Sequence, residues 1–81
     1  MANVEVAERV TAGEKMKRRY EHIHFEDDGG KVYYCKNNQS KGIVGVVSYY
    51  PSWKRYVFEG REFCVFDISC LADIIDFMKQ L

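Results

Sequence analysis

Residues 49–58 of the chain read YYPSWKRYVF, and five of these ten residues are aromatic. Pro51 and Ser52 stand in the middle of the stretch, where they favour a turn. The residues on either side alternate between apolar and other side chains, which is typical of the two strands of a β-hairpin. We therefore predict a hairpin whose aromatic rings either build a core or face a binding partner.

The pairing of this hairpin follows from the length of its loop. With Pro51-Ser52 as a two-residue loop, Val47 would face Tyr56 and Gly45 would face Phe58. A glycine opposite a phenylalanine lets the ring lie over the backbone. One face would then be apolar, and we expect it to form the core, with Ile43, Val47, Tyr49, Tyr56 and Phe58.

A second hairpin is predicted over residues 21–36. Asp28-Gly29 is a strong signal for a two-residue loop, because both loop positions need positive φ. A turn shifted by one residue, to Gly29-Gly30, would set Ile23 against Lys36. The Asp28-Gly29 register instead pairs apolar residues with each other, Phe25 with Val32 and Ile23 with Tyr34. It also sets opposite charges across from each other, Glu26 with Lys31 and Glu21 with Lys36.

The C-terminal part of the chain predicts one more strand and a helix. After a turn at residues 59–62, residues 63–66 would return as a strand, with Phe63 opposite Phe58. Asp67 is a suitable helix N-cap, and Phe66 and Leu71 occupy the two positions of a hydrophobic staple. The helical spacing indicates one apolar stripe, composed of Leu71, Ile74, Ile75 and Met78.

Together these patterns predict an α+β fold, in which an antiparallel meander of four to five strands carries a C-terminal helix packed on one face. The chain has 81 residues, enough for one domain. We expect residues 1–16 to form a flexible N-terminal arm and residues 17–81 to form the single domain. Lys and Arg balance Asp and Glu at 12 each, which argues against a general nucleic-acid coat protein.

The three cysteines are an odd number, which favours reduced thiols and a cytoplasmic location. No apolar run is long enough to span a membrane, and the N-terminus lacks the pattern of a signal peptide. In the predicted register His22 faces Cys35, and His24 lies on the same outer face. These groups can bind Zn²⁺, but their spacing matches no standard zinc pattern and a fourth ligand is not evident. We therefore expect no metal and no cofactor.

Catalytic patterns are also missing from the sequence. A Cys–His pair would need a third, orienting group, and no Gly-rich phosphate loop or pair of cleft carboxylates is recognisable. We therefore expect a protein that is not an enzyme.

The block from Tyr20 to Phe77 resembles a family of small uncharacterised proteins of phages and prophages. The resemblance is carried by Gly45, the 49–58 hairpin, Val65-Phe66 and the segment CLADIIDF at residues 70–77. That family usually carries a proline-bearing turn after the hairpin, where this chain has Glu59-Gly60. The resemblance implies a mobile-element origin, no known enzyme activity, and a partner among host or anti-phage defence enzymes that the protein would inhibit.

The candidate partner-binding residues lie around the aromatic hairpin. A loop longer than Pro51-Ser52 would place Tyr50 and Trp53 at its tip. Tryptophan, tyrosine and arginine dominate the binding energy of protein interfaces. The predicted surface therefore consists of Tyr50, Trp53, Lys54 and Arg55, with Tyr33 nearby on the outer face.

The alternative function is binding of single-stranded nucleic acid. A meander followed by one helix resembles, in topology, the single-stranded-DNA-binding fold of the transcription coactivator PC4, whose members dimerise. Aromatic rings stack on unpaired bases, and cations contact the backbone. Possible contacts are the basic cluster of Lys15, Lys17, Arg18 and Arg19. A homodimer is also possible, through the open sheet face or an edge strand.

Overall fold

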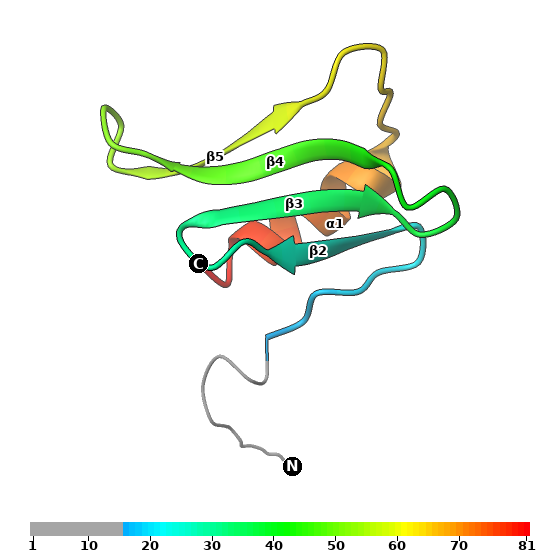
Figure 1. Ribbon diagram of the computed structural model, residues 1–81, viewed down its shortest axis with the longest axis horizontal. Helices are drawn as coiled ribbons and strands as arrows, with labels where there is room; N and C mark the ends of the chain where they lie inside the picture. Colours follow the sequence, from blue (N-terminus) through cyan, green and yellow to red (C-terminus); the bar gives the residue numbers. More distant parts are fainter. Residues whose placement is uncertain (1–15) are drawn as a thin grey trace.

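A computed structural model describes residues 16–81 and shows one antiparallel sheet with a C-terminal helix across one of its faces (Figure 1). The sheet has the order β2-β3-β4-β5, so each strand pairs with its neighbour in the sequence. This arrangement confirms the predicted α+β fold with four strands. The elements are β2 (Ile23–Asp27), β3 (Val32–Asn37), β4 (Ile43–Tyr50), β5 (Arg55–Gly60) and α1 (Ile68–Met78).

The core lies between α1 and the sheet. Its centre is a stacked pair of rings, Phe25 from β2 and Phe77 from α1, whose centroids are 3.9 Å apart and whose planes are parallel within 1°. Burial of such large apolar side chains is the main favourable contribution to folding in a domain of this size. The other buried apolar residues are Tyr20, Ile23, Cys35, Val47 and Ile74.

The start of α1 is as predicted, and its buried face is so only in part, because Ile74 and Met78 pack inward but Leu71 and Ile75 do not. Asp67 caps the helix, because its Oδ1 accepts a hydrogen bond of 2.8 Å from the Cys70 N–H. Ile74 and Phe77 face the sheet, whereas Leu71 and Ile75 are 44% and 53% exposed. The helix carries two apolar stripes, and helical periodicity does not say which of them packs inward. The stripe that contains Phe77 is the buried one because the Phe77 ring stacks on Phe25.

The predicted register of the first hairpin is wrong by three residues. Phe25 pairs with Cys35, and Glu26 pairs with Tyr34. The loop comprises residues 28–31 and is closed by a bond from the Asp28 N–H to the Val32 carbonyl (3.0 Å). Inside it, Gly29 has a φ of 90° and donates its N–H to the Asp27 side chain (2.7 Å). Because a shift by an odd number of residues exchanges the two faces of a strand, Cys35 turns toward the core.

In the second hairpin the predicted register is wrong by two residues, which leaves the faces unchanged. Val47 pairs with Phe58 and Tyr49 pairs with Tyr56, around a four-residue loop of residues 51–54. Gly45 stands opposite Gly60 and not opposite Phe58, but the ring of Phe58 still lies over Gly45. A Cβ added at Gly45 would overlap that ring and lie 3.0 Å from the Glu59 carbonyl oxygen, so only glycine fits here.

Because of a bulge at the start of β4, one residue of the core differs from the prediction. The pairing with β3 passes from Cys35–Gly45 to Lys36–Ile43, so Val44 is an extra residue. A bulge of this kind turns the chain by one position. Val44 therefore packs against the core, and Ile43 does not.

The predicted fifth strand is absent from the described residues. Phe63 and Val65 are 95% and 92% exposed, and Phe63 has a φ of 67° that breaks an extended conformation. Of this segment only Phe66 packs against the sheet, with its ring edge-on to Phe58 at 5.5 Å. β5 is consequently the last strand of the sheet.

The edge of β2 is covered by the residues that precede it. Arg19 forms a bridge with His24, and the Phe25 N–H donates to the Arg18 carbonyl (2.9 Å). Gln80, after α1, holds Lys17 with two bonds of 2.8 Å, one to its N–H and one to its carbonyl. Residues 1–15 lie outside the described part of the chain, and Met16 packs against the core.

Candidate functional site

The loop of the β4–β5 hairpin lies at one end of the sheet, away from α1 (Figure 1). It is held by two turn bonds of 3.1 Å, from the Trp53 N–H to the Tyr50 carbonyl and from the Lys54 N–H to the Pro51 carbonyl. Trp53 is 63% exposed and Tyr50 is 44% exposed. Their rings contact each other edge to face at 5.0 Å. We call Tyr50, Trp53, Lys54 and Arg55 the hairpin tip.

A hollow of about 270 Å³ adjoins the hairpin tip; we call it the outer hollow. Tyr50 and Trp53 form one side of it, and Glu59 supplies a carboxylate. Most of its residues lie, by the register, on the sheet face opposite α1. Sequence reasoning missed the residues that complete it, although the hairpin register would have found them. The full lining is Ser48, Tyr50, Trp53, Val57, Phe58 and Glu59.

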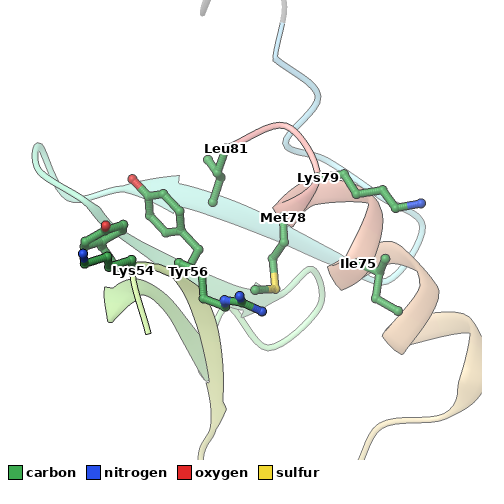
Figure 2. Close-up of a pocket in the computed structure, with 8 residues that line it drawn as sticks. Lys54, Tyr56, Ile75, Met78, Lys79 and Leu81 are labelled. Carbon is green, nitrogen blue, oxygen red and sulfur yellow. The ribbon is translucent and has the colours of Figure 1, made fainter. Parts of the chain in front are cut away.

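A larger hollow of about 560 Å³, the inner hollow, lies between the hairpin and the C-terminal end of α1 (Figure 2). Its walls are mostly apolar, and three cationic side chains border it without any Asp or Glu. A fourth cation, Lys31, places its Nζ 4.4 Å from the centre of the Tyr49 ring. The hollow is therefore a mostly apolar groove bordered by cations, and it is lined by Tyr49, Lys54, Arg55, Tyr56, Ile75, Met78, Lys79 and Leu81.

Tyr33 does not lie on the outer face near the hairpin tip, contrary to the prediction. It lies on the face that packs against α1, where its ring is edge-on to Phe77 at 5.2 Å. Burial raises the pKa of its hydroxyl. The cause of the wrong placement is the register of the first hairpin, because a shift of three residues exchanged Tyr33 with Tyr34 on the outer face.

The basic cluster lies at the opposite edge of the sheet from the hairpin tip. The Arg18 guanidinium is 3.9 Å from the Asp27 carboxylate, and the Lys17 ammonium lies 4.6 Å from the centre of the Tyr20 ring. Arg19 is exposed, and Lys15 lies outside the described residues. The structure therefore does not bring this cluster together with Trp53.

The histidines and Cys35 do not meet. Cys35 is fully buried on the helix side, and burial raises the pKa of its thiol to about 12. His24 lies on the other face of the sheet, and His22 is exposed before β2. Within residues 16–81 no three His, Cys, Asp or Glu side chains are grouped so that they could hold a metal ion.

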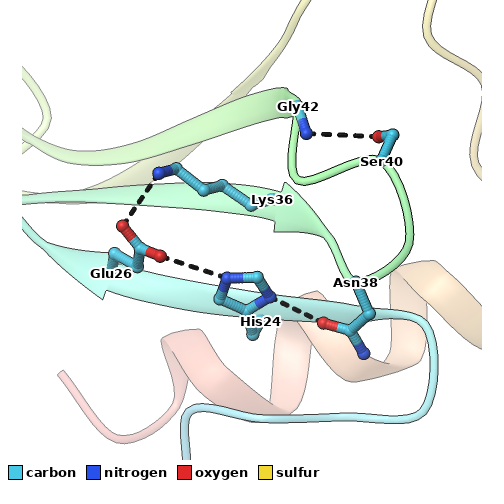
Figure 3. A network of polar contacts seen from close by, with 6 residues as sticks. All are labelled: His24, Glu26, Lys36, Asn38, Ser40 and Gly42. Atoms are coloured by element: carbon cyan, nitrogen blue, oxygen red, sulfur yellow. Dashed lines mark hydrogen bonds and ion pairs between the residues drawn. The ribbon is translucent and has the colours of Figure 1, made fainter.

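His24 instead belongs to a polar network that sequence reasoning missed (Figure 3). The Asn38 Nδ2 donates to the carbonyls of Tyr20 (2.8 Å) and Glu21 (3.1 Å), so its Oδ1 accepts from His24 Nδ1 (2.6 Å). Glu26 Oε2 lies 3.2 Å from His24 Nε2, and Glu26 Oε1 accepts from the Lys36 ammonium at 2.9 Å. This network fastens residues 20–22 to β2 and is structural.

The carboxylate of this network is tuned by its partners. The contacts of its side chain with Lys36, and then with His24, hold the pKa of Glu26 below its ordinary value. The alternation of His24 and Glu26 on one strand face was visible in the sequence. Asn38, which comes from the next loop, was not.

The chain matches no protein-family model, no curated protein and no solved structure. Its one described helix, α1, is neither long nor apolar enough to cross a membrane.

Proposed function

We propose that this chain is a non-catalytic domain that binds a protein partner through the hairpin tip. The observation that carries the proposal is the position of Trp53, whose side chain stays largely in water at the end of an ordered hairpin. A tryptophan is buried to a large extent in most proteins. An exposed tryptophan beside tyrosine and arginine has the composition of an interface hot spot.

The hairpin tip is organised before any partner arrives. The ring of Tyr50 supports Trp53, and the Arg55 Nε donates to the Trp53 carbonyl at 3.3 Å. Ordering side chains at an interface costs about 0.5–1.5 kcal/mol for each flexible one. A preformed pair of rings avoids part of that cost.

The charge around the hairpin tip favours an acidic partner surface. Lys54 and Arg55 belong both to the tip and to the inner hollow, which carries no Asp or Glu side chain in its lining. Complementary charge speeds encounter and selects among partners. Together with the resemblance to small phage proteins, this supports a host or anti-phage defence enzyme as the partner, with the chain acting as its inhibitor.

Binding of single-stranded nucleic acid is the alternative, and the exposed Tyr50–Trp53 pair beside two cations is the observation in its favour. Against it, the basic cluster lies along the far edge of the sheet and does not extend the cations of the hairpin tip into one track. Fluorescence anisotropy with a short single strand at two salt concentrations separates the functions. Binding that weakens steeply with salt supports nucleic acid, and no binding at moderate salt removes it.

Affinity capture from host lysate tests the main proposal. The wild-type chain should enrich a partner that mass spectrometry identifies, and Trp53→Ala should lose it while melting at the same temperature. Phe63→Ala is the matched control, because Phe63 is an exposed ring away from the hairpin tip. Equal capture by wild type and Trp53→Ala would refute the assignment of the hairpin tip, and a large fall in melting temperature would show that Trp53 serves the fold.

A further inference from the structure

β5 presents an open row of backbone groups. In an antiparallel ladder, residue pairs that exchange hydrogen bonds alternate with pairs that do not. The Arg61 N–H donates to the Val44 carbonyl (2.8 Å), so Arg61 and Val44 form a hydrogen-bonded pair. Counting back along β5 in the observed register, every second residue bonds to β4, and the residues between them point their backbone groups away from β4. These outward residues are Tyr56, Phe58 and Gly60. Within the described chain no backbone bond reaches those N–H groups. Such an edge is a template for another strand.

We infer that this edge pairs with the same edge of a second copy of the chain. The two β5 strands would run antiparallel about a two-fold axis at Val57, and they would join two four-stranded sheets into one. In this register Val57 faces Val57 of the second copy. Tyr56 faces Phe58, and Arg55 faces Glu59, each pair occurring twice because the interface is symmetric.

The residues of β5 favour this register over its neighbours. Tyr56 and Phe58 both have outward backbone groups, so together they can form a hydrogen-bonded pair. Opposite charges directly across a pair of strands are stabilising, as are aromatic pairs. A shift of the second copy by two residues would set Arg55 against Arg61 in one direction and against Val57 in the other. Only the register centred on Val57 matches charge with charge and ring with ring.

The open edge also lacks the usual protection against pairing. Natural sheets protect their edges with proline, bulges, inward charges or a covering segment. The β2 edge is covered by residues 18–20. The middle of β5, by contrast, has the sequence YVF and contains no proline. Its pairing with β4 is regular, so no bulge interrupts it. Self-pairing would give β5 the cover that the predicted fifth strand does not supply.

The pairing leaves the hairpin tip largely free. Trp53 lies outside the paired residues 55–59, so a dimer would present two tips at opposite ends of the joined sheet. The inference therefore does not rest on the proposed function. Because few residues pair, we expect weak association that depends on protein concentration.

Sedimentation equilibrium from about 1 µM to about 1 mM tests the dimer. The wild type should shift from monomer to dimer within this range. Arg55→Glu and Glu59→Arg should each weaken association by about tenfold or more, because each replaces two attractive pairs with two repulsive ones. Glu62→Arg is the control for Glu59→Arg, since it makes the same change of charge outside β5.

Mixing the two weakened variants gives the decisive result. A heterodimer of Arg55→Glu with Glu59→Arg pairs opposite charges at both positions, so the mixture should associate as the wild type does. The N–H groups of Tyr56 and Phe58 should exchange more slowly with solvent at high concentration. A wild type that stays monomeric up to about 1 mM, or a mixture that stays monomeric while each variant melts normally, would overturn the inference.

Discussion

The two edges of the sheet differ in what covers them. The β2 edge is closed by residues 18–20, by the Asn38 network and by a helix whose buried ring stacks on Phe25. The β5 edge has no paired strand among the described residues, and the segment that follows it leaves Phe63 and Val65 in water. The sheet thus has one covered edge, at β2, and one open edge, at β5.

This difference separates stability from binding. Around β2, polar groups are satisfied and rings are buried, so substitutions there should unfold the domain. At the hairpin tip, the rings of Tyr50 and Trp53 are exposed, so substitutions there should change binding and leave the fold intact. Ligand-binding segments are commonly drawn from the less stable parts of a protein.

The largest effect is expected for Phe77→Ala, which removes the fully buried ring that stacks on Phe25. Loss of a buried phenylalanine costs about 3–5 kcal/mol. Ile75→Ala, on the exposed stripe of the same helix, should cost less than about 1 kcal/mol, because half of its side chain is already in water. Urea unfolding of both variants checks this. A loss for Ile75→Ala as large as that for Phe77→Ala would contradict the assignment of the Phe77 stripe as the buried one.

A smaller loss of stability is expected for Asn38→Ala, which would loosen the covered edge at β2. It leaves the carbonyls of Tyr20 and Glu21 and the Nδ1 of His24 without their partner. An unsatisfied buried group costs about 1–3 kcal/mol, and the Glu21 carbonyl, which is exposed, costs less because water replaces Asn38 there. Hydrogen exchange at the Phe25 N–H, which is bonded to Arg18, should accelerate, and in Gln39→Ala it should not. Unchanged protection of Phe25 would show that Asn38 does not hold this edge.

Acid should weaken the same edge through Glu26. Its pKa is held below the ordinary 4.5 by Lys36 and His24 in the folded protein. The carboxylate therefore contributes stability that is present above pH 4.5 and is lost as the pH falls through the lowered pKa. The difference in unfolding free energy between wild type and Glu26→Gln should shrink on acidification below that point. A difference that stays constant into acid would contradict this role.

The smallest effect on stability is expected for Trp53→Ala, on the open side. An exposed side chain contributes about 0.5 kcal/mol or less to folding. Trp53 is the only tryptophan of the chain, so its fluorescence reports the hairpin tip directly. The emission of the folded protein should already be that of a solvated ring and should change little on unfolding. A large shift on unfolding would place Trp53 in a buried site.

Local patterns were sufficient for the element order and for several faces. Asp67 signals the start of α1 because an N-cap acts within one turn of helix. The inward face of β4 and β5 was predicted despite a wrong register, since an error of two residues leaves side-chain direction unchanged. The longer loop, given as an alternative from the sequence, is the one observed, with Trp53 inside it and Arg55 at the start of β5.

Other features could not be read from local patterns. The register of β2 and β3 depends on a loop that Asp27 caps, and the predicted register, wrong by three residues, placed Tyr33 on the outer face, where it does not lie. Phe63 looked like a strand residue, but its φ of 67° ends the sheet at β5. The inner hollow needs residues of α1 and of the hairpin together, which no single segment signals.

By itself, the sequence determined the alternation that makes four strands, the capped helix after them and the aromatic hairpin with its cations. Only the tertiary structure decided which stripe of α1 is buried, which edge is covered and that Trp53 stays in water. The physical reason is the distance along the chain over which the deciding interactions act. Periodicity and capping act over a few residues, whereas register, helix face and edge protection depend on contacts such as Phe25 with Phe77 and Lys17 with Gln80, which are distant in the chain.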